Sequence, residues 1–96
     1  MDRIGPFSWD EAKRISNREK HGVDFSEAQH FELESAVVLR DDRNDYGEAR
    51  SRAFGRLKGH LHVLVFTWRS GRIRIISLRR ANAREINRYA KKEKST

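Results

Sequence analysis

The chain has 96 residues, a formal net charge of +7 and no cysteine. This length supports one modest hydrophobic core, so we expect a single domain over residues 1–96, and the lack of cysteine excludes disulfides and thiolate metal sites. No apolar run approaches the roughly 20 residues that span a bilayer, and the N-terminus lacks a signal-peptide core, so we expect a cytoplasmic protein without a membrane partner.

Three segments open with a residue whose side chain can cap a helix. The predicted helices cover about residues 9–20 after Ser8, 26–33 after Asp24, and 83–92 after Asn82. Gly22 is suited to end the first helix, because glycine readily adopts the left-handed conformation that closes a helix. The tail, residues 91–96, is expected to fray.

Between the second and third helices, the residue pattern is typical of β-strands. Strands are expected at about residues 36–39, 49–57, 60–68 and 73–78, with a tight hairpin turn at Ser70-Gly71 before the last one. Segregated helices and hairpin-linked strands predict an α+β fold. It has two N-terminal helices, one mainly antiparallel sheet of about four strands, and a C-terminal helix.

Charge is divided unevenly along the chain. Residues 49–96 hold 14 basic and 2 acidic residues, a charge of +12, whereas residues 1–48 carry −5. Few acids of the C-terminal half are available to pair with these cations, and a field of one sign attracts a polyanion. We therefore expect a nucleic acid partner, RNA in particular. The candidate RNA-binding residues are Lys20, Arg50, Arg52, Arg56, Arg69, Arg72 and Arg80.

Strand parity assigns the arginines of the last strand to faces of the sheet. Arg72 and Arg74 share one face, whereas Arg79 falls on the opposite face. This mixture predicts a basic groove at one end of the sheet. A single arginine in such a set is more often a solvated side chain, but the cluster as a whole favours polyanion binding.

The acidic and histidine residues do not form a recognisable metal site. Asp41, Asp42 and Asp45 fail the calcium-loop spacing, because Arg52 stands where a glutamate is needed, so they predict a turn. His60 and His62 have strand spacing on one face but no third ligand, and such a pair is more often unligated. We expect no metal and no cofactor.

A metal-free ribonuclease is compatible with these residues, because RNA carries its own nucleophile, the 2′-hydroxyl. Arginines can stabilise the charge that develops on the phosphate. His21 and Tyr89 are candidates for proton transfer. Each also has a purely structural explanation, since His21 can favour a helix C-terminus and Tyr89 can lie at the edge of the core.

The chain resembles the BrnT family, the ribonuclease toxins of a bacterial type II toxin–antitoxin system, from about residue 7 to 89. The N-terminal motif is Phe7-x-Trp9-Asp10-x-x-Lys13, then Asn17, then Lys20-His21-Gly22-Val23-x-Phe25-x-Glu27-Ala28. The C-terminal motif is Ile73-Arg74-Ile75-Ile76-Ser77-x-Arg79-x-Ala81, then Glu85 and Tyr89. The chain departs from the family pattern at Phe66, where Tyr is frequent, and at Leu78, where Ala is common.

The resemblance implies a compact RelE-like toxin fold and RNA cleavage that inhibits translation. It also implies a BrnA-type antitoxin, which binds DNA as a complex with the toxin, and hence a hetero-oligomer. The catalytic residues carried over first are Arg79 and Tyr89, with Arg74 beside them, and His21 lies within the N-terminal motif. The alternative hypothesis is a non-catalytic basic module that binds nucleic acid or an acidic protein with strong salt dependence.

Overall fold

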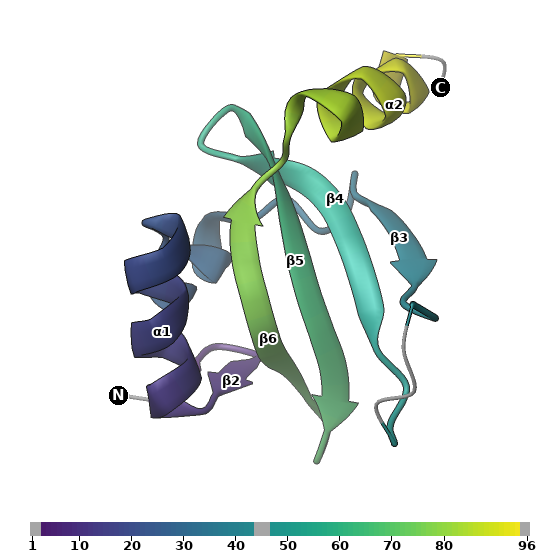
Figure 1. The fold of residues 1–96 in the computed structure, drawn as a ribbon. Coiled ribbons are helices and arrows are strands. Elements are labelled where there is room, and N and C mark those ends of the chain that lie inside the picture. The colour runs from purple at the N-terminus through teal and green to yellow at the C-terminus, as the bar shows by residue number, and fades with distance from the viewer. Residues whose placement is uncertain (1–2, 44–46, 95–96) are drawn as a thin grey trace.

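The computed structural model describes residues 3–43 and 47–94 as an α+β fold built on one six-stranded sheet (Figure 1). In chain order the elements are β1 (Arg3–Ile4), β2 (Phe7–Trp9), α1 (Glu11–His21), the 3-10 helix η1 (Phe25–His30), β3 (Val37–Arg40), β4 (Ser51–Leu57), β5 (His60–Arg69), β6 (Arg72–Arg80) and α2 (Ala83–Lys94). The strand order is β1-β2-β6-β5-β4-β3. Within the described residues, no helix is long and apolar enough to cross a lipid bilayer.

The predicted architecture of two N-terminal helices and about four mainly antiparallel strands is wrong. The chain begins with two short strands instead, and β2 pairs with β6 in parallel, so the sheet is mixed. The helix predicted over residues 26–33 is the six-residue 3-10 segment η1, which leaves α1 as the one α-helix of the N-terminal half within the described residues. Asp45 and residues 95–96, which the turn and tail predictions include, lie outside the described residues.

Residue spacing explains why η1 is a 3-10 helix. Side chains three residues apart lie above one another in this helix type. Phe25, Ala28 and Phe31 have that spacing, and all three are buried in the core. The segment ends at Phe31, which forms a bridge with Leu57 of β4. The spacing of three therefore places three apolar groups on the sheet without a regular α-helix.

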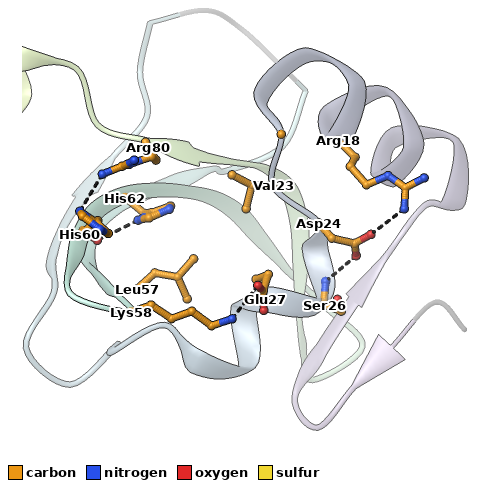
Figure 2. A pocket seen from close by; sticks show the side chains of 11 residues that line it. Arg18, Val23, Asp24, Ser26, Glu27, Leu57, Lys58, His60, His62 and Arg80 are labelled. Carbon is orange, nitrogen blue, oxygen red and sulfur yellow. Dashed lines mark hydrogen bonds and ion pairs between the residues drawn. The ribbon is translucent and has the colours of Figure 1, made fainter.

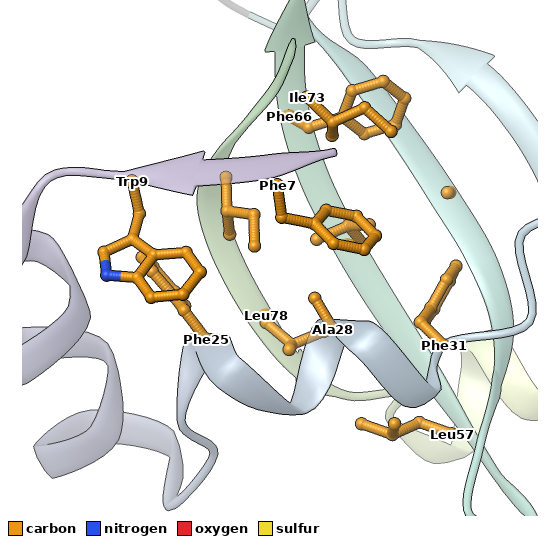
Figure 3. Packing of buried hydrophobic residues seen from close by; sticks show 12 residues of the cluster. Phe7, Trp9, Phe25, Ala28, Phe31, Leu57, Phe66, Ile73 and Leu78 are labelled. Atoms are coloured by element: carbon orange, nitrogen blue, oxygen red, sulfur yellow. The ribbon is translucent and has the colours of Figure 1, made fainter. Parts of the chain in front are cut away.

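Two hydrophobic clusters lie on opposite faces of the sheet. The first is covered by α1 and η1 and includes Phe7, Trp9, Phe25, Ala28, Phe31, Leu57, Phe66, Ile73 and Leu78 (Figure 3). The second contains Phe54, Leu61, Val63, Val65 and, from α2, Tyr89. Figure 1 shows α2 at the end of the sheet where β6 finishes. We call these the α1 face and the α2 face.

A β-bulge in β6 changes which arginines share a face. Phe66 pairs with Ile75, but the preceding Val65 pairs with Ser77, so Ile76 is an extra residue on β6. Beyond the bulge the alternation is reversed. As a result, Arg79 and Arg74 each pair with a residue of β5, and these two β5 residues are four positions apart in the sequence. Residues an even number of positions apart on a strand share a face, so both arginines lie on the α2 face. The parity prediction that separated Arg79 from Arg74 is therefore wrong.

Asn17 anchors α1 to the edge of β6. Its buried amide donates to the Leu78 carbonyl oxygen at 2.8 Å and to the Val23 carbonyl oxygen at 3.0 Å, and its Oδ1 accepts from the Leu78 N–H at 3.2 Å. The helix then ends at Gly22, whose φ of 73° is left-handed. These contacts bring the C-terminus of α1, with His21, alongside the end of β6.

Candidate active site

Ionisable side chains converge on the α2 face in a cavity of about 210 Å³ between β4 and α2. The side chains that line it are Arg52, Phe54, Asn82, Arg84, Glu85, Arg88 and Tyr89. Three guanidinium groups, one carboxylate and one phenol therefore surround a single small space, and Arg79 adjoins it through Glu85.

The start of α2 positions Glu85 and Tyr89. The Glu85 N–H donates to Asn82 Oδ1 and the Asn82 N–H donates to Glu85 Oε1, both at 2.9 Å, which is a reciprocal capping box. Four residues later on the same helix face, Tyr89 stacks on Phe54 with the ring centroids 3.9 Å apart and 11° between the planes. The stack fixes α2 against β4 and turns both side chains toward the sheet.

Arg79 and Glu85 form a two-pronged ion pair. Arg79 Nη1 is 2.8 Å from Glu85 Oε1 and Nη2 is 3.0 Å from Oε2. Hydrogen bonding from Arg79 is the main reason that the pKa of the Glu85 carboxyl lies below its usual value. The Asn82 N–H and the positive charges of Arg79 and Arg52 lower this pKa further, while burial opposes the shift. Glu85 is therefore ionised at neutral pH.

Arg52 places an under-satisfied cation beside this pair. Its buried Nε has no hydrogen-bond partner and lies 3.9 Å from Asp41 Oδ1. Asp41 is bound more closely by Arg43, whose Nε lies 2.7 Å away and which lowers the pKa of that carboxyl to about 2. The Arg52 guanidinium carbon lies 5.7 Å from the centroid of the Phe54 ring. Arg52 also lines the cavity, so an anion there would be attracted by the charge of its guanidinium.

His21 lies on the other side of Arg79, at the end of α1. Burial lowers the pKa of its imidazole, and the charges of Lys20 and Arg79 lower it further. The ring is therefore mainly neutral at pH 7 and can accept a proton or a hydrogen bond.

The remaining predicted site residues are spread over the sheet. Arg74 is on the α2 face but pairs with Thr67 and Ser8, so the structure does not bring it next to Arg79. Arg72 donates to the Gly5 carbonyl oxygen at 2.8 Å. Arg56 pairs across the sheet with Leu61 of the second cluster, and Arg80 lies on the α1 face.

The charge prediction considers only the acids of the C-terminal half, but acids of the N-terminal half partly neutralise the arginines of residues 49–96. Glu48 pairs with Arg50 at 3.6 Å and with Arg69 at 3.2 Å. The pair with Arg69 spans 21 residues of sequence, whereas Arg50 is a near neighbour of Glu48 that lies across the boundary between the two halves. Within the described part of the chain, the α2-side arginines for which no ion pair with a carboxylate is seen include Arg72, Arg74, Arg84 and Arg88.

Three ionisable residues of the cavity are absent from the predicted site: Arg84, Glu85 and Arg88. In the sequence Glu85 stands out only as part of the C-terminal motif, and the structure shows that it also completes the helix cap. A usable signal was its spacing of four from Tyr89, which puts a carboxylate and a phenol on one helix face. Among residues 3–43 and 47–94, no group of three His, Asp or Glu side chains is arranged to hold a metal ion.

A family model described as "Ribonuclease toxin, BrnT, of type II toxin-antitoxin system" matches residues 9–85. The chain belongs to the BrnT family. Among curated proteins, none matches the chain well enough to add a nearer relative. Membership of this toxin family implies an RNA target and an antitoxin partner. Arg52, Arg79 and Glu85 lie inside the matched segment, and Tyr89 lies just beyond it.

Proposed function

We propose that this BrnT-family chain is an endoribonuclease whose active site is the cavity between β4 and α2 together with Arg79. The observation that carries the proposal is the convergence of Arg52, Arg79, Glu85 and Tyr89 on one face of the sheet. Cleavage through the ribose 2′-hydroxyl requires cations that bind the phosphate, a base and an acid. Here the arginines, the ionised carboxylate and the phenol supply these groups.

The first step is exchange of anions at Arg79. A substrate phosphate competes with the Glu85 carboxylate, because the guanidinium fork binds either oxyanion through two oxygens. Arg52 supplies a second cation from the wall of the cavity. The phosphate is then held by two arginines where negative charge develops, and Glu85 is released.

The released Glu85 carboxylate accepts the proton of the 2′-hydroxyl, and the oxygen attacks phosphorus in line. The bond from phosphorus to the 5′-oxygen breaks, and that oxygen takes a proton from Tyr89. The products are a 2′,3′-cyclic phosphate and a 5′-hydroxyl, and Glu85 returns its proton to Tyr89 through water. His21 orients the RNA backbone at Arg79, and Arg74 binds a neighbouring phosphate. Because the arginines supply the positive charge, we expect cleavage without a metal ion.

Cleavage of RNA by the purified protein tests the proposal. We expect products ending in a 2′,3′-cyclic phosphate, with and without EDTA and with and without ribosomes. Arg79→Ala and Glu85→Gln should each lower the rate by roughly 10²- to 10³-fold, the usual cost of losing a group that acts on the transition state. Arg40→Gln is the matched control, since Arg40 is an exposed arginine of β3 paired with Asp42. RNA left intact under all four conditions would refute the proposal, and binding without cleavage would favour the non-catalytic module.

We further propose that cleavage inhibits translation, in the cytoplasm, and that the antitoxin is of the BrnA type and binds DNA as the complex. Induced wild-type protein should arrest growth, whereas Arg79→Ala should not. Co-expression of a ribbon–helix–helix protein encoded by the adjacent reading frame should restore growth. Continued arrest in the presence of that protein would contradict the assignment of the partner.

A further inference from the structure

A second cavity, which the proposed mechanism does not use, lies on the α1 face. It measures about 540 Å³ and is enclosed by the end of α1, η1 and the β4–β5 hairpin (Figure 2). Cavities that bind small ligands measure roughly 300–1,000 Å³, so this one is large enough for a nucleotide.

His62 directs a hydrogen-bond acceptor into this cavity. The side chain belongs to a residue only 6% exposed, and Figure 2 shows the ring pointing into the space. Its Nδ1 lies 2.8 Å from the His60 carbonyl oxygen. A carbonyl only accepts, so Nδ1 carries the proton and Nε2 carries the lone pair. Within the described residues, Nε2 has no hydrogen-bond partner. Burial lowers the pKa of the His62 imidazole, so the ring is neutral at pH 7.

Arg80 supplies a cation on the same wall. Its Nη2 lies 2.6 Å from His60 Nδ1, and because a guanidinium only donates, His60 accepts there as a neutral ring. No carboxylate among the described residues pairs with Arg80. The rest of its fork is therefore free for an anion at the mouth of the cavity.

The opposite wall carries carboxylates that are held in place. Glu27 Oε1 is bound by Lys58 at 2.9 Å, and Asp24 Oδ2 by Arg14 at 2.8 Å. Leu57 and Val23 add apolar surface between the two walls. The cavity thus offers an anion site at one end, an apolar lining, and several acceptors that call for N–H donors.

Resting on the proposed function, we infer that this cavity binds one nucleotide of the RNA next to the cleaved bond, with its phosphate on Arg80 and its base against Leu57. The base donates N–H groups to His62 Nε2 and to the carboxylate wall. Guanine, adenine and cytosine carry amino groups that fit such acceptors, whereas uracil presents two carbonyl oxygens beside its single N–H. We therefore expect amino-bearing bases to bind better than uracil.

Strand geometry connects the two cavities. Arg79 and Arg80 are consecutive residues of β6 and point to opposite faces, with adjacent Cα atoms about 3.8 Å apart. An RNA strand held at Arg79 therefore reaches Arg80 by passing over the edge of β6. Lys20 and His21 at the end of α1 line that edge with further nitrogen donors.

Titration with 5′-mononucleotides, followed by NMR of the His62 ring and by calorimetry, tests the inference. We expect GMP, AMP and CMP to bind at least fivefold more tightly than UMP and than inorganic phosphate. Arg80→Gln should weaken nucleotide binding at least tenfold, and Arg40→Gln should leave it unchanged. His62→Phe should remove the preference over UMP, and its amide spectrum will establish that it folds. Equal affinity for UMP, an unperturbed His62 ring, or wild-type affinity in Arg80→Gln would overturn the inference.

The same variants separate this inference from the proposed function. Mononucleotides contain no bond for the enzyme to cleave, so their binding can be measured even in a chain that cleaves no RNA. Nucleotide binding without RNA cleavage would refute the proposed function alone. RNA cleavage that Arg80→Gln does not alter, together with no nucleotide binding, would refute the inference alone. If Arg80→Gln lost antitoxin binding but kept nucleotide binding, the cavity would be a protein-docking site. That result would also overturn the inference.

Discussion

At the scale of single residues, the ion pair of Arg79 with Glu85 joins stability to the proposed chemistry. Both side chains are partly buried, and Glu85 also completes the cap of α2. The pair keeps the carboxylate ionised and in place while no RNA is bound. A phosphate that displaces it exchanges one oxyanion for another, so the cost of opening the site is small compared with that of leaving either charge unpaired.

Replacing Glu85 by Gln should change how stability depends on pH. The folded-state pKa of Glu85 lies below its usual 4.5, so its contribution to the free energy of unfolding is present above that value. It is lost as pH falls through the lowered pKa. In urea unfolding, the deficit of Glu85→Gln relative to wild type should be constant from pH 6 to 7 and shrink below about pH 4.5. A deficit that does not change with pH would show that the ion pair contributes nothing.

Tyr89 combines a packing role with a proposed chemical one, and two substitutions separate them. Tyr89→Phe keeps the stack on Phe54 and should unfold within about 1 kcal/mol of wild type, yet lose most cleavage. Tyr89→Ala should cost about 3–5 kcal/mol, because it removes a buried ring. Chemical denaturation and an RNA cleavage assay measure the two effects. Wild-type cleavage by Tyr89→Phe would exclude the hydroxyl from the reaction.

At the scale of elements, the helices α1 and α2 begin and end within about two residues of the predicted positions, because caps and a glycine stop are local signals. The cap predicted at Ser8 is wrong, since Ser8 lies in β2 and Asp10 caps α1. The parallel pair β2–β6 was not predictable in this way, since its partners are more than 60 residues apart. The bulge at Ile76 was also missed, because parity counting assumes an unbroken strand. The same limit applies to the candidate site: motif membership selects Arg79 and Tyr89 as candidates, but only the packing of α2 brings Arg52 to them.

Gly55 of β4 packs closely against Phe31, the residue that ends η1. A Cβ atom on Gly55 would lie 2.8 Å from Cζ of Phe31 and 3.0 Å from Cβ of Ala36. Gly55→Ala should therefore destabilise the fold by about 1–3 kcal/mol through overpacking. Pairing this change with Phe31→Leu should recover part of the loss, measured as the free energy of unfolding in urea. An unchanged stability in Gly55→Ala would mean that η1 can shift away from the sheet.

At the scale of the whole molecule, cations concentrate on the α2 face although acids of the N-terminal half pair with some of them. Of the arginines without a carboxylate partner, Arg74, Arg84 and Arg88 extend from the first half of β6 to α2. An extended polyanion can contact all three, whereas a small anion cannot. This distribution explains why net charge alone predicted the class of partner but not the position of the site.

The affinity for RNA should therefore fall with salt concentration, and the steepness of that fall should report the number of these phosphate contacts. The probe is an RNA with 2′-O-methyl riboses, which lacks the nucleophile. For single strands the logarithm of affinity falls with the logarithm of salt concentration by about 0.7 per phosphate contact, so Arg74→Gln should reduce the slope by about 0.7. Arg40→Gln should leave the slope unchanged. A slope that Arg74→Gln does not alter would remove Arg74 from the RNA path.

The amide of Asn17 has a further consequence for how other chains can assemble with this one. By taking both the N–H and the carbonyl oxygen of Leu78, it occupies the place of a neighbouring strand with a single side chain. No foreign strand can pair there unless α1 first detaches. Strand addition, whether by a partner or during aggregation, is thereby directed to the terminal strands β1 and β3, away from the end of β6 where both cavities meet.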